Sequence, residues 1–137
     1  MKRSSKTLIA AGLTFTAALQ QTRADTVVIV SAQSAVAPLT TEQISRIFQG
    51  KSNTMTPVDI AEHSYARRQF YTKVIGRDEA QVKAQWSRLV FTGKGSAPKE
   101  LPSGAEVVKA VAADPNAIGY VDRSFVNMTV KVIYTVK

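Results

Sequence analysis

The chain has 137 residues, no cysteine and a formal net charge of +8 at neutral pH. The absence of cysteine excludes disulfides, thiolate metal sites, cysteine nucleophiles and a lipid-modified N-terminal cysteine. Four of the eighteen basic residues lie in the first 24 positions and all ten acidic residues lie after them, so the remaining chain has an excess of only +4, spread along its length, and nucleic acid is not an expected partner.

Residues 1–24 have the pattern of a secretory signal peptide. A basic start is followed by an apolar or small stretch at residues 8–19, and Thr22-Arg23-Ala24 places small residues where a signal peptidase reads them. The apolar stretch is too short to span a bilayer as a helix. We expect cleavage after Ala24, with Ala18 as the less favoured site. The mature protein would then be a soluble, periplasmic domain of residues 25–137, long enough for one compact core.

The rest of the chain alternates between strand-like and helix-like segments. Short β-branched or aromatic runs predict strands, and apolar residues at helical spacing between a capping residue and a glycine or proline predict helices. The expected strands are residues 26–31, 56–61, 117–122 and 128–136, and the expected helices run from Thr40 to Gly50, from Ser64 to about Ile75, from Asp78 onward and from Ser103 to before Pro115. Residues 92–104 are expected to form a loop. This order predicts an α/β domain with a mixed, mainly parallel sheet flanked by helices.

Capping residues and apolar faces define the expected packing. Thr40 with Gln43 and Ser103 with Glu106 fit capping boxes, in which each side chain bonds the backbone of the other residue. One shared core is expected for Ile44, Ile47, Phe48, Phe70, Trp86, Leu89, Val107, Val108, Val111, Ile118 and Tyr120, with Val90 on the same helical face as Trp86 and Leu89.

The sequence contains no convincing catalytic or metal-binding pattern. Asp59, His63 and Ser64 lie too close together in the chain to align as the members of a catalytic triad. Gly93-Lys94-Gly95 lacks the spacing of a phosphate-binding P-loop, and a helix end followed by a turn explains it better. No paired histidines or carboxylate cluster suggest a metal site. We therefore expect neither an enzyme nor a cofactor.

The stretch from Ser64 to Arg68 allows two interpretations. A serine at a helix N-terminus with an arginine in the first turn could bind an oxyanion, because the helix end exposes N–H groups and arginine grips two oxygens at once. The alternative is the ordinary start of an amphipathic helix, with Ser64 as a cap and Arg67 and Arg68 in solvent. The residues alone leave both interpretations open.

Three motifs in this order resemble the phosphate-type periplasmic substrate-binding proteins of ABC transporters, which have the type 2 periplasmic-binding fold. The motifs are LTTEQISRIFQGK, VDIAEHSYARRQFYTKVIG and PNAIGYVD. The first is carried by Leu39, Thr40, Gln43, Ile44, Ile47, Phe48 and Gly50, and the last by Ile118, Gly119 and Tyr120. Because complete members have two lobes and about twice this length, the chain resembles a short relative with a single lobe.

The resemblance implies a ligand, a site and partners. Ser64 and Arg67 stand in the serine and arginine places of the family's phosphate-binding turn, while Tyr65 and Ala66 stand where the family has glycine and threonine. The implied function is non-enzymatic binding of phosphate or a similar oxyanion, together with an ABC transporter permease or another envelope protein. The alternative function is a cell-envelope protein-interaction module that kept the fold and lost the ligand.

Overall fold

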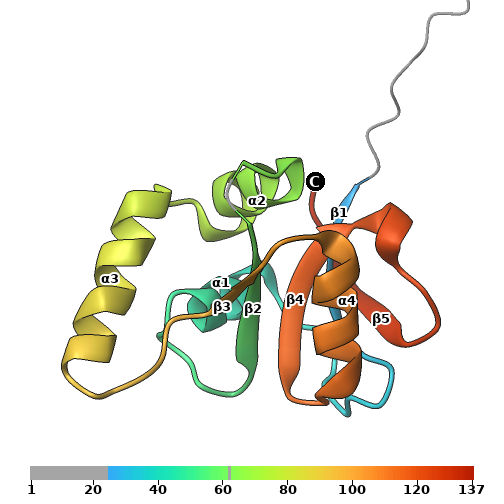
Figure 1. The fold of residues 1–137 in the computed structure, drawn as a ribbon, viewed down its shortest axis with the longest axis horizontal. Coiled ribbons are helices and arrows are strands. Elements are labelled where there is room, and N and C mark those ends of the chain that lie inside the picture. The colour runs from blue at the N-terminus through green and yellow to red at the C-terminus, as the bar shows by residue number, and fades with distance from the viewer. Residues whose placement is uncertain (1–24, 62) are drawn as a thin grey trace, which may run out of the picture.

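The computed structural model describes residues 25–61 and 63–137, so the predicted signal peptide lies outside the described residues (Figure 1). The strands are β1 (Thr26–Ser31), β2 (Thr56–Ile60), β3 (Lys99–Leu101), β4 (Ala117–Asp122) and β5 (Val130–Thr135). The helices are α1 (Thr41–Phe48), α2 (Tyr65–Phe70) with its π-helical continuation η1 (Tyr71–Ile75), α3 (Glu79–Phe91), α4 (Gly104–Ala113) and the 3₁₀ turn η2 (Arg123–Phe125).

The five strands form one mixed sheet in the order β3-β2-β4-β1-β5. The β2–β3 and β2–β4 pairs are parallel, and β1 is antiparallel to both β4 and β5. Four strands therefore run in one direction and β1 runs against them, which confirms the predicted α/β class with a mixed, mainly parallel sheet.

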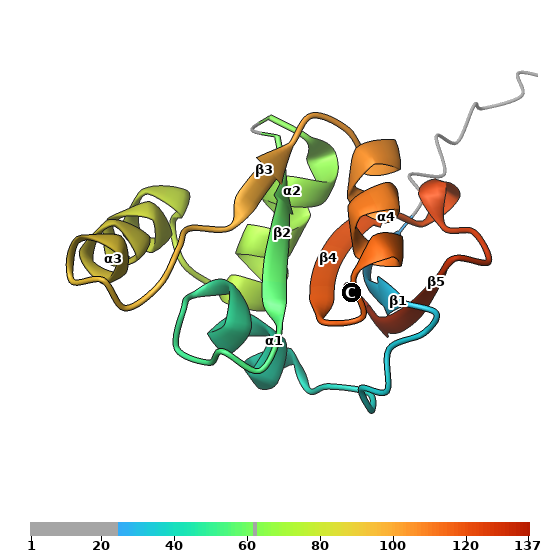
Figure 2. The same ribbon diagram turned by 60° about the horizontal axis from the view of Figure 1, so that its bottom comes forward.

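Helices cover both faces of this sheet (Figures 1 and 2). On β4, a Cβ at Gly119 would approach the side chains of Val107 and Val111 of α4 to 2.9 and 3.0 Å, so α4 packs directly against the strand backbone. The next residue, Tyr120, points to the opposite face. There its ring stacks on Phe70 at 4.0 Å between centroids and meets Phe48 edge-on at 5.7 Å. The core therefore lies on both sides of β4.

Side-chain caps fix the helix starts where the sequence predicts them. Thr40 and Gln43 form the full capping box of α1, and Ser64, Asp78 and Ser103 each accept a backbone N–H at the start of α2, α3 and α4. At the far end of η1, Gly76 has φ of +66°, a left-handed conformation that glycine adopts without a steric penalty. The sequence did not reveal that the second half of this helix would be π-helical.

Two other features differ from the sequence-based expectation. The predicted loop at residues 92–104 contains the short edge strand β3, which pairs in parallel with β2. Helix α3 stands at the end of the molecule, beyond β2 and β3 (Figure 1). Only Val82 of this helix is fully buried: Trp86 is half-buried and packs on the core, Leu89 is half-buried, and Val90 is 49% exposed. The prediction that Leu89 belongs to the shared core was therefore wrong: its side chain lies against Gly50, outside the core cluster, and Val90 is open to solvent.

No helix within residues 25–61 and 63–137 is long and apolar enough to cross a membrane.

The aromatic cluster should carry a large share of the stability. Phe48 is 1% exposed and contacts two other rings, whereas Phe91 is 91% exposed. Replacing Phe48 with Ala should lower the free energy of unfolding by about 3–5 kcal/mol, while Phe91→Ala should change it by less than about 0.5 kcal/mol. Urea unfolding of the two variants beside the wild type measures both values. Equal effects would mean that the helix faces are assigned wrongly.

Candidate functional site

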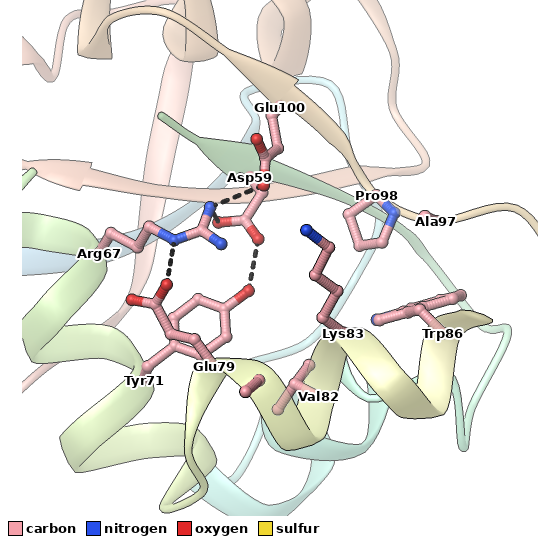
Figure 3. A pocket seen from close by; sticks show the side chains of 11 residues that line it. Asp59, Arg67, Tyr71, Glu79, Val82, Lys83, Trp86, Ala97, Pro98 and Glu100 are labelled. Carbon is pink, nitrogen blue, oxygen red and sulfur yellow. Dashed lines mark hydrogen bonds and ion pairs between the residues drawn. The ribbon is translucent and has the colours of Figure 1, made fainter. Parts of the chain in front are cut away.

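A cavity of about 480 Å³ opens between α3 on one side and strands β2 and β3 on the other (Figure 3). Its polar wall includes Asp59 of β2, Arg67 of α2 and Glu100 of β3, and its opposite wall includes Lys83 and Trp86 of α3. A cavity of this size is typical of small-molecule sites.

Arg67 is the most heavily bonded side chain of the site. It is only 5% exposed, and its guanidinium group contacts three carboxylates. Nε lies 3.2 Å from Glu79, while Nη1 lies 3.1 Å from Glu100 and 3.4 Å from Asp59. Nη1 also donates a hydrogen bond to the backbone carbonyl of Ile60 at 2.8 Å. The positive charge is therefore balanced inside the protein.

Asp59 is the buried partner in this cluster. It is 3% exposed and accepts hydrogen bonds from the hydroxyl groups of Tyr71 (2.6 Å) and Tyr120 and from the backbone N–H of Ile60 (3.0 Å). Burial raises the pKa of Asp59 above its ordinary value, and the two tyrosine hydroxyls, Arg67 and the Ile60 N–H oppose that shift by stabilising the carboxylate. The carboxylate therefore depends on all of these donors.

The same cluster perturbs the groups around it. Burial lowers the pKa of Arg67, but Asp59, Tyr71, Tyr120 and Glu79 together raise it by more, so the guanidinium stays protonated. Burial, followed by the field of Asp59, raises the pKa of both Tyr71 and Tyr120, which keeps their hydroxyls protonated as donors. The guanidinium carbon also lies 4.9 Å from the centroid of the Tyr71 ring, a cation–π distance.

The predicted anion-site residues lie together at the start of α2, but their polar groups are used locally. Ser64 Oγ accepts the backbone N–H of Arg67 at 3.0 Å, and the Tyr65 hydroxyl accepts a hydrogen bond from Gln69 at 2.7 Å. Ala66 is buried. The guanidinium group of Arg67 points toward the carboxylates and the cavity, while Arg68 donates to the carbonyl of His63 at 2.8 Å. The Ser64 hydroxyl therefore contacts the backbone N–H of Arg67, while the guanidinium group of Arg67 bonds other residues.

Sequence reasoning missed the residues that surround Arg67. Glu79 and Glu100 are 12 and 33 positions away from it along the chain, and no motif connects them. Only Asp59 could have indicated this cluster from the sequence, since a carboxylate within an apolar strand needs polar partners when it is buried. Among the described residues, no three His, Asp or Glu side chains are grouped so that they could hold a metal ion.

The fold of the chain is similar to that of several solved structures. The chain matches a phosphate ABC transporter substrate-binding protein with bound phosphate from Clostridium perfringens with a TM-score of 0.65 at 20% identity, over 80% of this chain and 44% of that one. It matches an ABC-type phosphate transport receptor from Vibrio cholerae with a TM-score of 0.62 at 19% identity, over 80% and 45% of the two chains.

A third match is PstS from Borrelia burgdorferi, with a TM-score of 0.59 at 12% identity over 80% of this chain and 46% of that one. The chain has the fold of part of a phosphate-type substrate-binding protein. It spans less than half the length of these structures, which is consistent with a short single-lobe relative. No family model and no curated protein matches the chain.

The ion pair between Arg67 and Asp59 should make stability depend on pH. Arg67→Met removes the charge that opposes the burial of Asp59, so it should cost about 3–5 kcal/mol at neutral pH. Because burial raises the pKa of Asp59, its carboxyl group stays protonated in the folded state at pH values where it has already ionised in the unfolded state. Stability therefore falls as the pH rises from the unfolded-state pKa of Asp59 to its folded-state pKa. Without Arg67 the pKa of Asp59 should rise further, so this window extends upward and the cost of the substitution should shrink as the pH falls from neutral into the acidic range.

Denaturant unfolding at several pH values measures this cost. Arg68→Met is the matched control, since Arg68 is exposed and bonds only the His63 carbonyl within the described residues. The control should have a much smaller effect that does not vary with pH. A cost of Arg67→Met that stays constant from neutral to acidic pH would contradict the role given to Asp59.

Proposed function

We propose that this protein is an exported, non-enzymatic solute-binding protein built from a single periplasmic-binding-protein-like lobe. The observation that carries the proposal is the cavity of about 480 Å³ beside Arg67, in a chain with the fold of part of a phosphate-type substrate-binding protein. The signal-peptide pattern of residues 1–24 supports export to the periplasm. The partner expected for such a protein is an ABC transporter permease or another envelope protein.

The ligand expected from the resemblance is phosphate or a similar oxyanion at the start of α2, contacted by Ser64 and Arg67 beside Tyr65 and Ala66. Three features predict that this binding is weak. The charge of Arg67 is already shared by three carboxylates, Ala66 supplies no hydroxyl, and a single lobe leaves a bound anion open to water on one side. A dianion would also lie close to the negative charges of Glu79 and Glu100.

A cell-envelope interaction module that lost the ligand is the second candidate. The observation that favours it is the internal balance of the Arg67 charge, which leaves that group less able to attract an anion. Tyr65 and Ala66, at positions where the resembling family has glycine and threonine, favour it as well. Binding measurements on the purified domain distinguish the two candidates.

Isothermal calorimetry with phosphate and sulfate tests the oxyanion proposal. We expect a dissociation constant no tighter than about 0.1–1 mM, because each contact is modest where water reaches it. Ser64→Ala should weaken binding, and the double change Tyr65→Gly with Ala66→Thr should tighten it by restoring the family's turn. Ser103→Ala is the matched control, because Ser103 caps α4 as Ser64 caps α2.

Two outcomes would decide against the oxyanion site. If Ser64→Ala and Ser103→Ala affect phosphate binding equally, the anion does not bind at the start of α2. If neither the wild type nor the double variant binds any tested oxyanion, the oxyanion function is wrong.

A further inference from the structure

Lys83 is the cation in the cavity wall that forms no ion pair with any described residue. It lies on α3, opposite Arg67, and its amino group extends into the cavity from the α3 side (Figure 3). No carboxylate within residues 25–61 and 63–137 forms an ion pair with it, whereas Arg67 is paired with three. An anionic group that enters the cavity therefore finds its best partner at Lys83.

Acidic groups face the same space. Glu79 and Glu100 each contact Arg67 through one carboxylate oxygen, and their side chains are 40% and 50% exposed. Their second oxygen has no hydrogen bond to any described residue, so it remains able to accept one. A cationic group in the cavity would therefore have two acceptors, one on β3 opposite Lys83 and one on α3 a turn before it.

Between these charged groups the wall is apolar. Val82 and Trp86 of α3 face Ala97 and Pro98 of the segment before β3. The cavity is also much larger than a phosphate ion needs. A hydrocarbon or aromatic group can fill this part while polar groups of the same molecule reach the two charged sides.

We propose that this cavity binds a small zwitterion with an apolar body, of the amino-acid type. Its carboxylate pairs with Lys83, its ammonium group is accepted by Glu79 and Glu100, and its apolar body packs against Trp86 and Pro98. The proposal rests on the proposed solute-binding function, but it concerns a different ligand class and different residues from the oxyanion site at the start of α2.

The arrangement of the charges, rather than their sum, favours a zwitterion over an ion of one sign. With every group ionised, the cavity wall carries three carboxylates and two cations. A simple anion meets Lys83 but also faces the carboxylates, and a simple cation meets the carboxylates but leaves Lys83 without a partner. A molecule that carries both charges satisfies both sides and leaves the net charge of the site unchanged.

Trp86 provides a direct readout, since it lines the cavity and is the single tryptophan of the chain. Three probes share one phenethyl body: L-phenylalanine with both charges, 3-phenylpropanoate without the ammonium group and 2-phenylethylamine without the carboxylate. In titrations of Trp86 fluorescence on the full mature protein, L-phenylalanine should bind at least about tenfold more tightly than either analogue, because each analogue leaves one charged side of the cavity unsatisfied.

Two variants separate the two contacts. Lys83→Met keeps the apolar stem and should remove the preference for L-phenylalanine over 2-phenylethylamine, and Glu100→Gln should reduce the preference over 3-phenylpropanoate. Lys73→Met is the matched control, an exposed lysine outside the cavity, and should change neither preference. If an analogue binds as tightly as L-phenylalanine, or if Lys83→Met and Lys73→Met behave alike, the proposal is wrong.

The phosphate titrations separate failure of this proposal from failure of the proposed function. If phosphate binds and depends on Ser64 while L-phenylalanine does not bind, the zwitterion site is wrong and the oxyanion function stands. If neither binds, both are wrong and the interaction module is the remaining candidate.

Discussion

A buried guanidinium group must find its counter-charges inside the protein, and Arg67 meets this requirement by drawing four elements together. It extends from α2, pairs with Asp59 on β2, Glu79 at the start of α3 and Glu100 on β3, and leaves only 5% of its surface exposed. Removing one partner of a buried ion pair leaves an uncompensated charge, which is far more costly than losing a surface contact. Through Glu79 this cluster ties the start of α3 to α2, while Trp86 Nε1 ties the middle of α3 to the end of α1 by donating to the Phe48 carbonyl at 2.8 Å.

The same cluster limits what the lobe can recognise. An arginine beside a serine-capped helix start is suited to an oxyanion, yet here carboxylates already occupy the donors of Nε and Nη1. An anion must compete with these fixed partners and with the water that reaches the open side of the lobe. Lys83, across the cavity, is the cation that no described carboxylate pairs with, so the space between α3 and β3 offers charges of both signs beside an apolar wall.

The sequence predicted the elements whose signals are local and missed the features set by distant residues. Helix starts at Thr40 and Ser64 follow from bonds within one turn, and the buried strand at 26–31 follows from its composition. The exposure of Val90 could not be predicted, because a helical pattern does not reveal whether a neighbour covers its face. Likewise, Ser64 to Arg68 predicted a helix start with an arginine, but not the direction of the guanidinium group, which depends on carboxylates from three other elements.

A double-mutant cycle between Asp59 and Arg67 tests the internal pairing most directly. The free energy of unfolding is measured for the wild type, Asp59→Asn, Arg67→Met and the double variant at neutral pH. The account predicts a coupling energy of about 2 kcal/mol or more. The double variant should lose less stability than the sum of the losses in the two single variants, because removing both charges leaves neither charge buried alone. A coupling below about 0.5 kcal/mol would mean that the two residues act independently, and the account of Arg67 as an internally balanced charge would be wrong.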